Sequence, residues 1–274
     1  MTMNKSRFVT VIALSVALVL QSCVFADAQI IWLSSTKKAD FTNCDSETRQ
    51  LRPVDAINNE SSIDIIYVQS DVQSVIVQGD EPYFNKLHTD VSNGRLTIKM
   101  DKGNYRNLRL RVKISTPDIR SIKMTGSGNL TCESDITTDD KFTISLAGSS
   151  DVSVMAVKAN DFNVSVTGSG DISIESVETG TSDVSLAGSG DVRIERITAD
   201  DLRIGIAGSG DINIGKAVIA DDTDISLAGS GDVKINGRTD KVTVSVVGSG
   251  DVTGKFEYNS IKRKKAGTGD ITFY

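Results

Sequence analysis

Hydrophobic and polar residues alternate with a period of two over most of residues 50–274, and short glycine-rich segments interrupt the alternation at regular intervals. Such alternation is typical of β-strands that bury one face. The tetrapeptide Gly-Ser-Gly-Asp or a close variant occurs eight times, beginning at Gly126, Gly148, Gly168, Gly188, Gly208, Gly229, Gly248 and Gly267. Successive copies are 22, 20, 20, 20, 21, 19 and 19 residues apart. A repeat therefore organises the second half of the chain.

Each repeat carries apolar residues at alternating positions on both sides of its glycines. In one copy these are Val164 and Val166 before the turn and Ile172 and Ile174 after it, which predicts two or three strands of about five residues per repeat. A unit of this kind cannot close a core alone and must stack on its neighbours. We therefore predict an all-β fold, a right-handed parallel β-solenoid (β-helix) of ~20-residue coils. Cys132 is then a small apolar core residue of the first coil.

Residues 50–125 predict a less regular, antiparallel or mixed β region that leads into the repeats without a linker. The alternating runs are residues 63–68, 74–78, 95–100 and 108–114. Asn93-Gly94 has the chemistry of a tight hairpin turn. His88 lies between these runs, and we interpret it as a surface or packing residue.

The last repeat differs from the others, because Arg263 and Lys265 occupy its inward positions within a run of four basic residues. Charge at the open end of a solenoid blocks edge-to-edge growth, so we favour an end cap. The alternative is a basic patch that binds acidic glycans or lipid headgroups.

The N-terminus has the pattern of an export signal. Lys5 and Arg7 precede an uncharged run over residues 8–20, which is too short to span a bilayer as a helix and fits the apolar segment of a secretory signal. Two processing sites stay open. We favour cleavage by signal peptidase I after Ala28; the alternative is a lipoprotein signal that ends before Cys23, which would then be lipidated.

Composition narrows the classes of function. The chain has 36 acidic and 30 basic residues and a net charge of −6, which argues against binding to nucleic acid or to an anionic membrane surface. A lipid anchor would be the only membrane contact. A single histidine removes most histidine-based catalysis and most zinc sites. The glycine-rich turns lack the pattern of a phosphate-binding P-loop.

Seven aspartates follow the glycine turns in one register: Asp151, Asp171, Asp191, Asp211, Asp232, Asp251 and Asp270. Stacked coils place these carboxylates roughly 5 Å apart, and like charges this close destabilise unless something compensates. We favour a structural role in which each carboxylate accepts N–H bonds from its own Gly-Ser-Gly turn. The alternative is a ladder that binds Ca²⁺, as in Gly- and Asp-rich β-rolls. We assign no other cofactor and no defined metal site.

The segments 54–57, 63–65, 74–80 and 93–98, together with the repeats, resemble the auto-transporter adhesin, head GIN domain family of bacterial envelope proteins. The resemblance covers about residues 50–274. It implies a β-solenoid, a signal peptide or lipoprotein anchor, and a bacterium with two membranes, and it brings no catalytic residues. We therefore expect an exported protein in the periplasm or at the outer membrane or cell surface of a Gram-negative bacterium.

The chain is accordingly divided into a signal peptide (1–28), a leader (29–49) and one solenoid head domain (50–274) with regular repeats from about residue 120. The leading hypothesis is a non-enzymatic envelope protein, an adhesin or a binding or structural module, that contacts a protein or glycan through its solenoid faces. The alternative is a solenoid carbohydrate-active enzyme with a site in residues 50–125. A groove holding a cluster of carboxylates would support the enzyme.

Overall fold

The computed structural model describes residues 41 and 43–274. The predicted signal peptide with Cys23, and the leader up to residue 40, lie outside the described residues. Strands dominate the part that is described, with one short 3₁₀ helix. None of its helices is both long and apolar enough to cross a membrane.

The N-terminal region contains β1 (Asp45–Thr48), β2 (Ala56–Asn59), β3 (Asp64–Gln69), β4 (Ser74–Gly79), η1 (Glu81–Lys86), β5 (Leu87–Ser92), β6 (Arg95–Met100) and β7 (Leu110–Thr116). The solenoid begins with β8 (Ser121–Met124), β9 (Leu130–Cys132), β10 (Ile136–Thr137), β11 (Lys141–Gly148), β12 (Val152–Gly168), β13 (Ile172–Gly188) and β14 (Val192–Ala199). It continues with β15 (Asp201–Gly208), β16 (Ile212–Ile219), β17 (Asp222–Gly229), β18 (Val233–Gly248), β19 (Val252–Gly254), β20 (Phe256–Gly267) and β21 (Ile271–Phe273).

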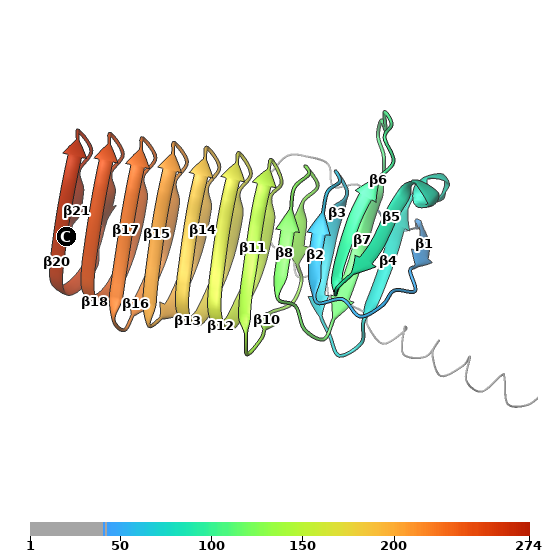
Figure 1. Cartoon of the computed structure of the whole chain (residues 1–274), viewed down its shortest axis with the longest axis horizontal. Coiled ribbons are helices and arrows are strands. Elements are labelled where there is room, and N and C mark those ends of the chain that lie inside the picture. The colour runs from blue at the N-terminus through green and yellow to red at the C-terminus, as the bar shows by residue number, and fades with distance from the viewer. Residues whose placement is uncertain (1–40, 42) are drawn as a thin grey trace, which may run out of the picture. The chain divides into compact units, whose positions relative to one another are not determined.

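The repeats stack as parallel coils in register, which confirms the predicted β-solenoid (Figure 1). Val152 of β12 pairs with Ile172 of β13, which in turn pairs with Val192 of β14. At the other end of the same strands, Gly168 pairs with Gly188. Each residue therefore lies beside its own counterpart one repeat away, and equivalent side chains form columns along the stack.

Each coil has three sides. Along β12, inward and outward residues alternate up to Val154, and two outward residues then separate Val154 from the next inward residue, Val157. A second pair of outward residues precedes Phe162, where the alternation begins again. The chain therefore bends twice within one continuous strand of 17 residues and turns a third time at the glycines. The short strands predicted from the alternation are the sides between these bends.

The core is a set of columns of Val, Ile and Leu side chains inside the coils. Phe142 and Phe162 of neighbouring coils stack with ring centroids 5.9 Å apart. Cys132 is 2% exposed in the first coil, as predicted. Cys132 and Cys44 are both free thiols.

The N-terminal region is a mixed β region, as predicted. β2 pairs in parallel with both β6 and β8, so it connects this region to the solenoid without a linker. β4 pairs antiparallel with β1 and β7, and β5 pairs antiparallel with β6. The turn between β5 and β6 holds Asn93 at φ 49° and Gly94 at φ 74°, the left-handed values that a tight hairpin requires.

Two elements of this region differ from the prediction. β1 lies within residues 29–49, the predicted leader, yet its residues pair with β4. The sheet therefore begins upstream of residue 50. His88 lies within a strand, β5, rather than between strands; it is exposed, with Nε2 2.7 Å from Oδ1 of Asp101.

The C-terminal coil carries charge at its inward positions, as predicted. Arg263 aligns with Val244 and Lys265 with Val246 of the preceding coil. Both basic side chains are exposed; Arg263 donates to the hydroxyl of Tyr258 (3.1 Å), and Lys265 pairs with Asp270 (2.8 Å).

Candidate functional site

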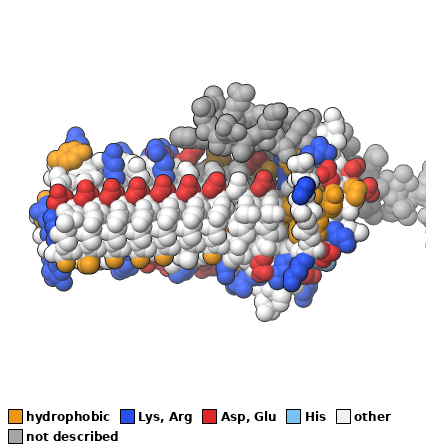
Figure 2. All heavy atoms as spheres, turned by 90° about the horizontal axis from the view of Figure 1, so that it is seen from above, with side chains coloured by type: hydrophobic (Ala, Val, Ile, Leu, Met, Phe, Trp, Pro, Cys, Tyr) orange, Lys and Arg blue, Asp and Glu red, His pale blue; other side chains and the backbone are white. Residues whose placement is uncertain are grey.

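The Gly-Ser-Gly-Asp turns lie along one edge of the solenoid, and their aspartates form a straight row of acidic side chains (Figure 2). From Gly148 onward, the first glycine of each turn has a backbone conformation that side chains disfavour, as at Gly208 with φ 151°. The turns also stack closely: a Cβ added to Gly210 would lie 1.9 Å from the carbonyl oxygen of Gly190. Glycine at these two positions therefore permits the spacing of the coils.

The seven aspartates are brought together as a hydrogen-bonded ladder. From Asp171 onward, the backbone N–H of each aspartate donates to Oδ1 of the aspartate one coil earlier. The distances are 3.3 Å from Asp171 to Asp151, 2.8 Å from Asp191 to Asp171, 3.0 Å from Asp211 to Asp191, 2.8 Å from Asp232 to Asp211, 2.8 Å from Asp251 to Asp232 and 2.7 Å from Asp270 to Asp251. Each rung of this aspartate ladder joins two coils.

This arrangement corrects the expected bonding partner. The carboxylates accept backbone N–H bonds, but not from their own turns. The N–H groups of a turn are already used: those of Ser209 and Gly210 both donate to the carbonyl of Gly188 in the preceding coil, at 2.9 and 3.2 Å. The N–H of the aspartate that follows the turn does not bond to a backbone carbonyl. It donates instead to the side-chain carboxylate of the aspartate one coil earlier.

The ladder continues beyond the seven predicted aspartates at its N-terminal end. Asn129 accepts from the N–H of Asp151 (2.9 Å), and its own N–H donates to Oδ1 of Asp64 (2.9 Å). Asp64 was not predicted as part of the ladder, since it lies outside the repeats. At the other end of the ladder, Oδ1 of Asp270 accepts from the ammonium group of Lys265 (2.8 Å).

Two opposing electrostatic effects act on the ladder. Carboxylates about 5 Å apart repel by about 0.8 kcal/mol per neighbouring pair in water, and less at physiological ionic strength. A hydrogen bond to a charged acceptor contributes about 1.5–3 kcal/mol, with less at an exposed position. The bonds therefore offset the repulsion, and the ladder ties the coils together.

The chemistry left to the ladder is weak cation attraction. Asp151 and its counterparts are exposed, apart from the half-buried Asp251. In the six aspartates before Asp270, one carboxylate oxygen accepts a bond from the next coil. Within the described part of the chain, no group of three or more His, Cys, Asp or Glu side chains is placed to hold a metal ion. Calcium binding along the ladder stays a prediction.

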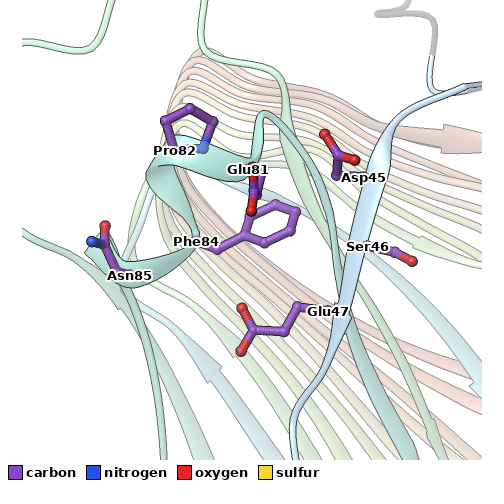
Figure 3. Close-up of a pocket in the computed structure, with 7 residues that line it drawn as sticks. All are labelled: Asp45, Ser46, Glu47, Glu81, Pro82, Phe84 and Asn85. Carbon is purple, nitrogen blue, oxygen red and sulfur yellow. The ribbon is translucent and has the colours of Figure 1, made fainter.

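A second acidic feature is an open hollow of about 550 Å³ between β1 and η1 (Figure 3). Asp45 and Glu47 line it from β1, and Glu81, Phe84 and Asn85 from η1. A carboxyl group that acts as an acid catalyst is usually buried, whereas these three carboxylates are exposed. The hollow thus gives the enzyme alternative no specific support.

The chain is similar to one described protein family and to several solved structures. The family model described as "Putative auto-transporter adhesin, head GIN domain" matches residues 54–218. No curated protein matches the chain. Among solved structures, a "putative adhesin" from Parabacteroides merdae is similar at 20% identity and a TM-score of 0.72, covering 85% of this chain and 97% of that one.

Two further solved structures come from Parabacteroides distasonis. One is a "putative adhesin" at 22% identity and a TM-score of 0.74, and the other a "Putative lipid binding protein" at 26% identity and 0.69. Both comparisons cover 85% of this chain and 97% of the other. Since the family model matches more than half of the chain, the protein belongs to the family described as "Putative auto-transporter adhesin, head GIN domain".

Proposed function

We propose that this protein is a non-enzymatic binding protein of the bacterial cell envelope, which is exported and adheres to a partner through its solenoid faces. The observation that carries the proposal is the in-register stacking of the coils, because it presents the same outward positions again and again along an extended surface. Such repeated surfaces are what solenoid proteins use to bind partners. The family to which the chain belongs supports adhesion.

The first experiment concerns location. The full chain is expressed in a Gram-negative host, and its membrane, periplasmic and cytoplasmic fractions are compared with those of a Cys23→Ser variant. We expect the protein outside the cytoplasm. If the protein is cleaved after Ala28, the variant fractionates like the wild type; if Cys23 is lipidated, the variant leaves the membrane fraction. Retention of the wild type in the cytoplasm contradicts the proposal.

The second experiment concerns adhesion. Beads coated with the processed protein are tested on bacterial cells, on surfaces coated with polysaccharides and on lipid bilayers; the bilayers are included because one structural relative is named a lipid binding protein. Beads coated with heat-unfolded protein are the control. We expect adhesion to at least one surface only with folded protein. If folded and unfolded coatings behave alike on every surface, the adhesive role is wrong.

A further inference from the structure

The solenoid departs from its repeat at one corner of the last coils. In β16, two residues, Gly215 and Lys216, separate the inward residues Ile214 and Ala217. In β18, Asn236 alone stands at this corner, and the pairing shifts so that Ile214 aligns with Ile235 but Ala217 with Gly237. Lys255 stands alone between Gly254 and Phe256 in the last coil. The corner is therefore one residue shorter in the last two coils than in the coil of β16. The longer corner of β16 has no counterpart for one of its residues in the next coil, which leaves a step in the surface.

A recess lies at this step. It has a volume of about 490 Å³ and lies among side chains of three consecutive coils. Its principal lining residues are Lys216, Val218, Asn236, Arg238, Lys255 and Glu257, and we call it the cationic recess. Three cations and one carboxylate thus surround one hollow, in a chain whose net charge is −6.

The three cations of the recess lack the ion pairs found elsewhere on the solenoid. Among the described residues, Lys216, Arg238 and Lys255 have no carboxylate within 4.0 Å in a salt bridge. Some other solenoid cations do have one, such as Lys158 with Glu178 at 2.7 Å and Lys241 with Asp222 at 3.1 Å, whereas Arg203 and Lys234 in the described part of the chain have none either. An anion in the recess would gain Coulomb energy from several positive charges at once.

One further cation stands at this corner in the coil before the recess, beside Glu195. The corner position that holds Lys216 is occupied by Arg196 one coil earlier and by the neutral Ser176 two coils earlier. Neighbouring coils lie about 4.8 Å apart, so Arg196 and Lys216 are neighbours along the solenoid axis, and Lys255 follows after the neutral Asn236. A row of this kind fits an elongated ligand that carries repeated negative charges.

The recess offers contacts besides charge. The side chain of Asn236 is oriented by the N–H of Lys255, which donates to its Oδ1 (3.0 Å), and this leaves the amide NH₂ as a donor. Val218 and the small residues Ala217 and Gly237 form an apolar wall. A sugar ring has both an apolar face and hydroxyl acceptors, and it can use both kinds of contact.

We propose that the cationic recess binds a strand of acidic polysaccharide, which lies along the corner of the last coils. The inference rests on the proposed binding function and names the ligand class. A membrane surface fits less well, because lipid docking by charge uses clusters of four to eight Lys or Arg on an accessible surface, and membrane-bound surfaces add exposed apolar anchors. The three lining cations surround a hollow instead.

The test measures binding of the processed full chain to polygalacturonic acid and dextran sulfate, with neutral dextran and phosphatidylglycerol vesicles in parallel. The recess variant is Lys216→Gln/Arg238→Gln/Lys255→Gln. Its matched control, Lys102→Gln/Lys123→Gln/Arg203→Gln, removes the same charge from exposed positions outside the recess and outside the basic run of the last coil. We expect the wild type to bind acidic polymers but not dextran, and the recess variant to lose more than about tenfold in affinity. The control should lose less than about threefold.

A second variant separates shape from charge. Val218→Trp fills the recess and keeps every cation, and a β-branched position in a strand accepts an aromatic residue. We expect it to lose binding as the recess variant does, with an unchanged circular dichroism spectrum.

Several results would overturn the inference: equal losses in the recess and control variants, a larger loss in the control, wild-type affinity of Val218→Trp, or binding of vesicles in place of polymers. If acidic polymers fail to bind while coated beads still adhere, the recess proposal is wrong and the adhesive function stands. If the beads adhere to no surface, the proposed function itself is wrong.

Discussion

The spacing of the coils makes a specific demand on Gly210, the second glycine of its turn. Replacing it with alanine places a Cβ 1.9 Å from the carbonyl oxygen of Gly190, whereas real Cβ atoms essentially never come within 3.0 Å of such a neighbour. The two coils must therefore separate locally by about 1 Å.

This separation stretches the hydrogen bonds that cross the turn. The N–H of Ser209 donates to the carbonyl of Gly188 at 2.9 Å, and the N–H of Asp211 donates to Asp191 at 3.0 Å. An added 1 Å takes both beyond hydrogen-bonding distance. At about 1–1.5 kcal/mol per bond, with strain added, we expect Gly210→Ala to lower the free energy of unfolding by about 3 kcal/mol.

Gly205 provides a matched control within the same strand-and-turn unit, since a Cβ there meets nothing within 4 Å. Gly205→Ala should be neutral or stabilise by up to about 1 kcal/mol, because alanine restricts the unfolded chain. Both variants are compared with the wild type by urea denaturation followed by circular dichroism. If the two variants unfold within about 0.5 kcal/mol of each other, close contact between the turns does not limit the stack.

Four further predictions follow from the ladder, the thiols and the end of the solenoid. Asp211→Ala should lower the free energy of unfolding by about 1 kcal/mol, because the N–H of Asp232 loses its acceptor. Asp211→Asn keeps an acceptor and relieves charge repulsion, so its free energy of unfolding should stay within about 0.5 kcal/mol of wild type in the same denaturation assay. Equal losses in the two variants would contradict the balance of hydrogen bonding and repulsion in the ladder. Millimolar Ca²⁺ and Mg²⁺ should shift the melting temperature equally, since isolated carboxylates offer fewer oxygens than calcium takes; a calcium-specific rise would establish a binding site. Burial raises the pKa of the Cys132 thiol to about 12, so a maleimide at pH near 8 should label the half-buried Cys44 and spare Cys132 in the folded protein, as mass spectrometry would reveal. The double variant Arg263→Val/Lys265→Val should associate end to end in size-exclusion chromatography, because it removes charge from the last coil; a monomer at every concentration would mean that these charges do not cap the solenoid.

The repeated part of the fold is readable from the sequence because every signal is local and recurs. The alternation around Val164 and Ile172 gives the strands, the glycines give the turns, and the spacing gives the stacking. The N-terminal region has no such redundancy. The pattern around His88 alternates only weakly, so the sequence does not predict β5. β1 consists of exposed residues, and its pairing with β4 leaves no hydrophobic signal in the sequence.

The candidate sites show the same contrast. The register of the aspartates was predictable, but the bonding partner was not, because spacing along the chain does not reveal which N–H group a neighbouring coil brings closest. The spacings of 19 residues already marked a shortened coil. Only the pairing of Ala217 with Gly237 shows that the missing residue comes from a corner and that Lys216, Arg238 and Lys255 gather there.

All rungs of the aspartate ladder point the same way, from an N–H in the later coil to a carboxylate in the earlier one. In a coil that has just formed, the aspartate N–H already donates to the coil before it. The aspartate carboxylate of the same coil stays without its donor until the next stretch of chain supplies an N–H. Synthesis delivers the N-terminal part first, so the base formed around β2 and β3 can template the first coil and each coil the next. Assembly then has a built-in direction, which runs from the N-terminal base toward the C-terminal coil.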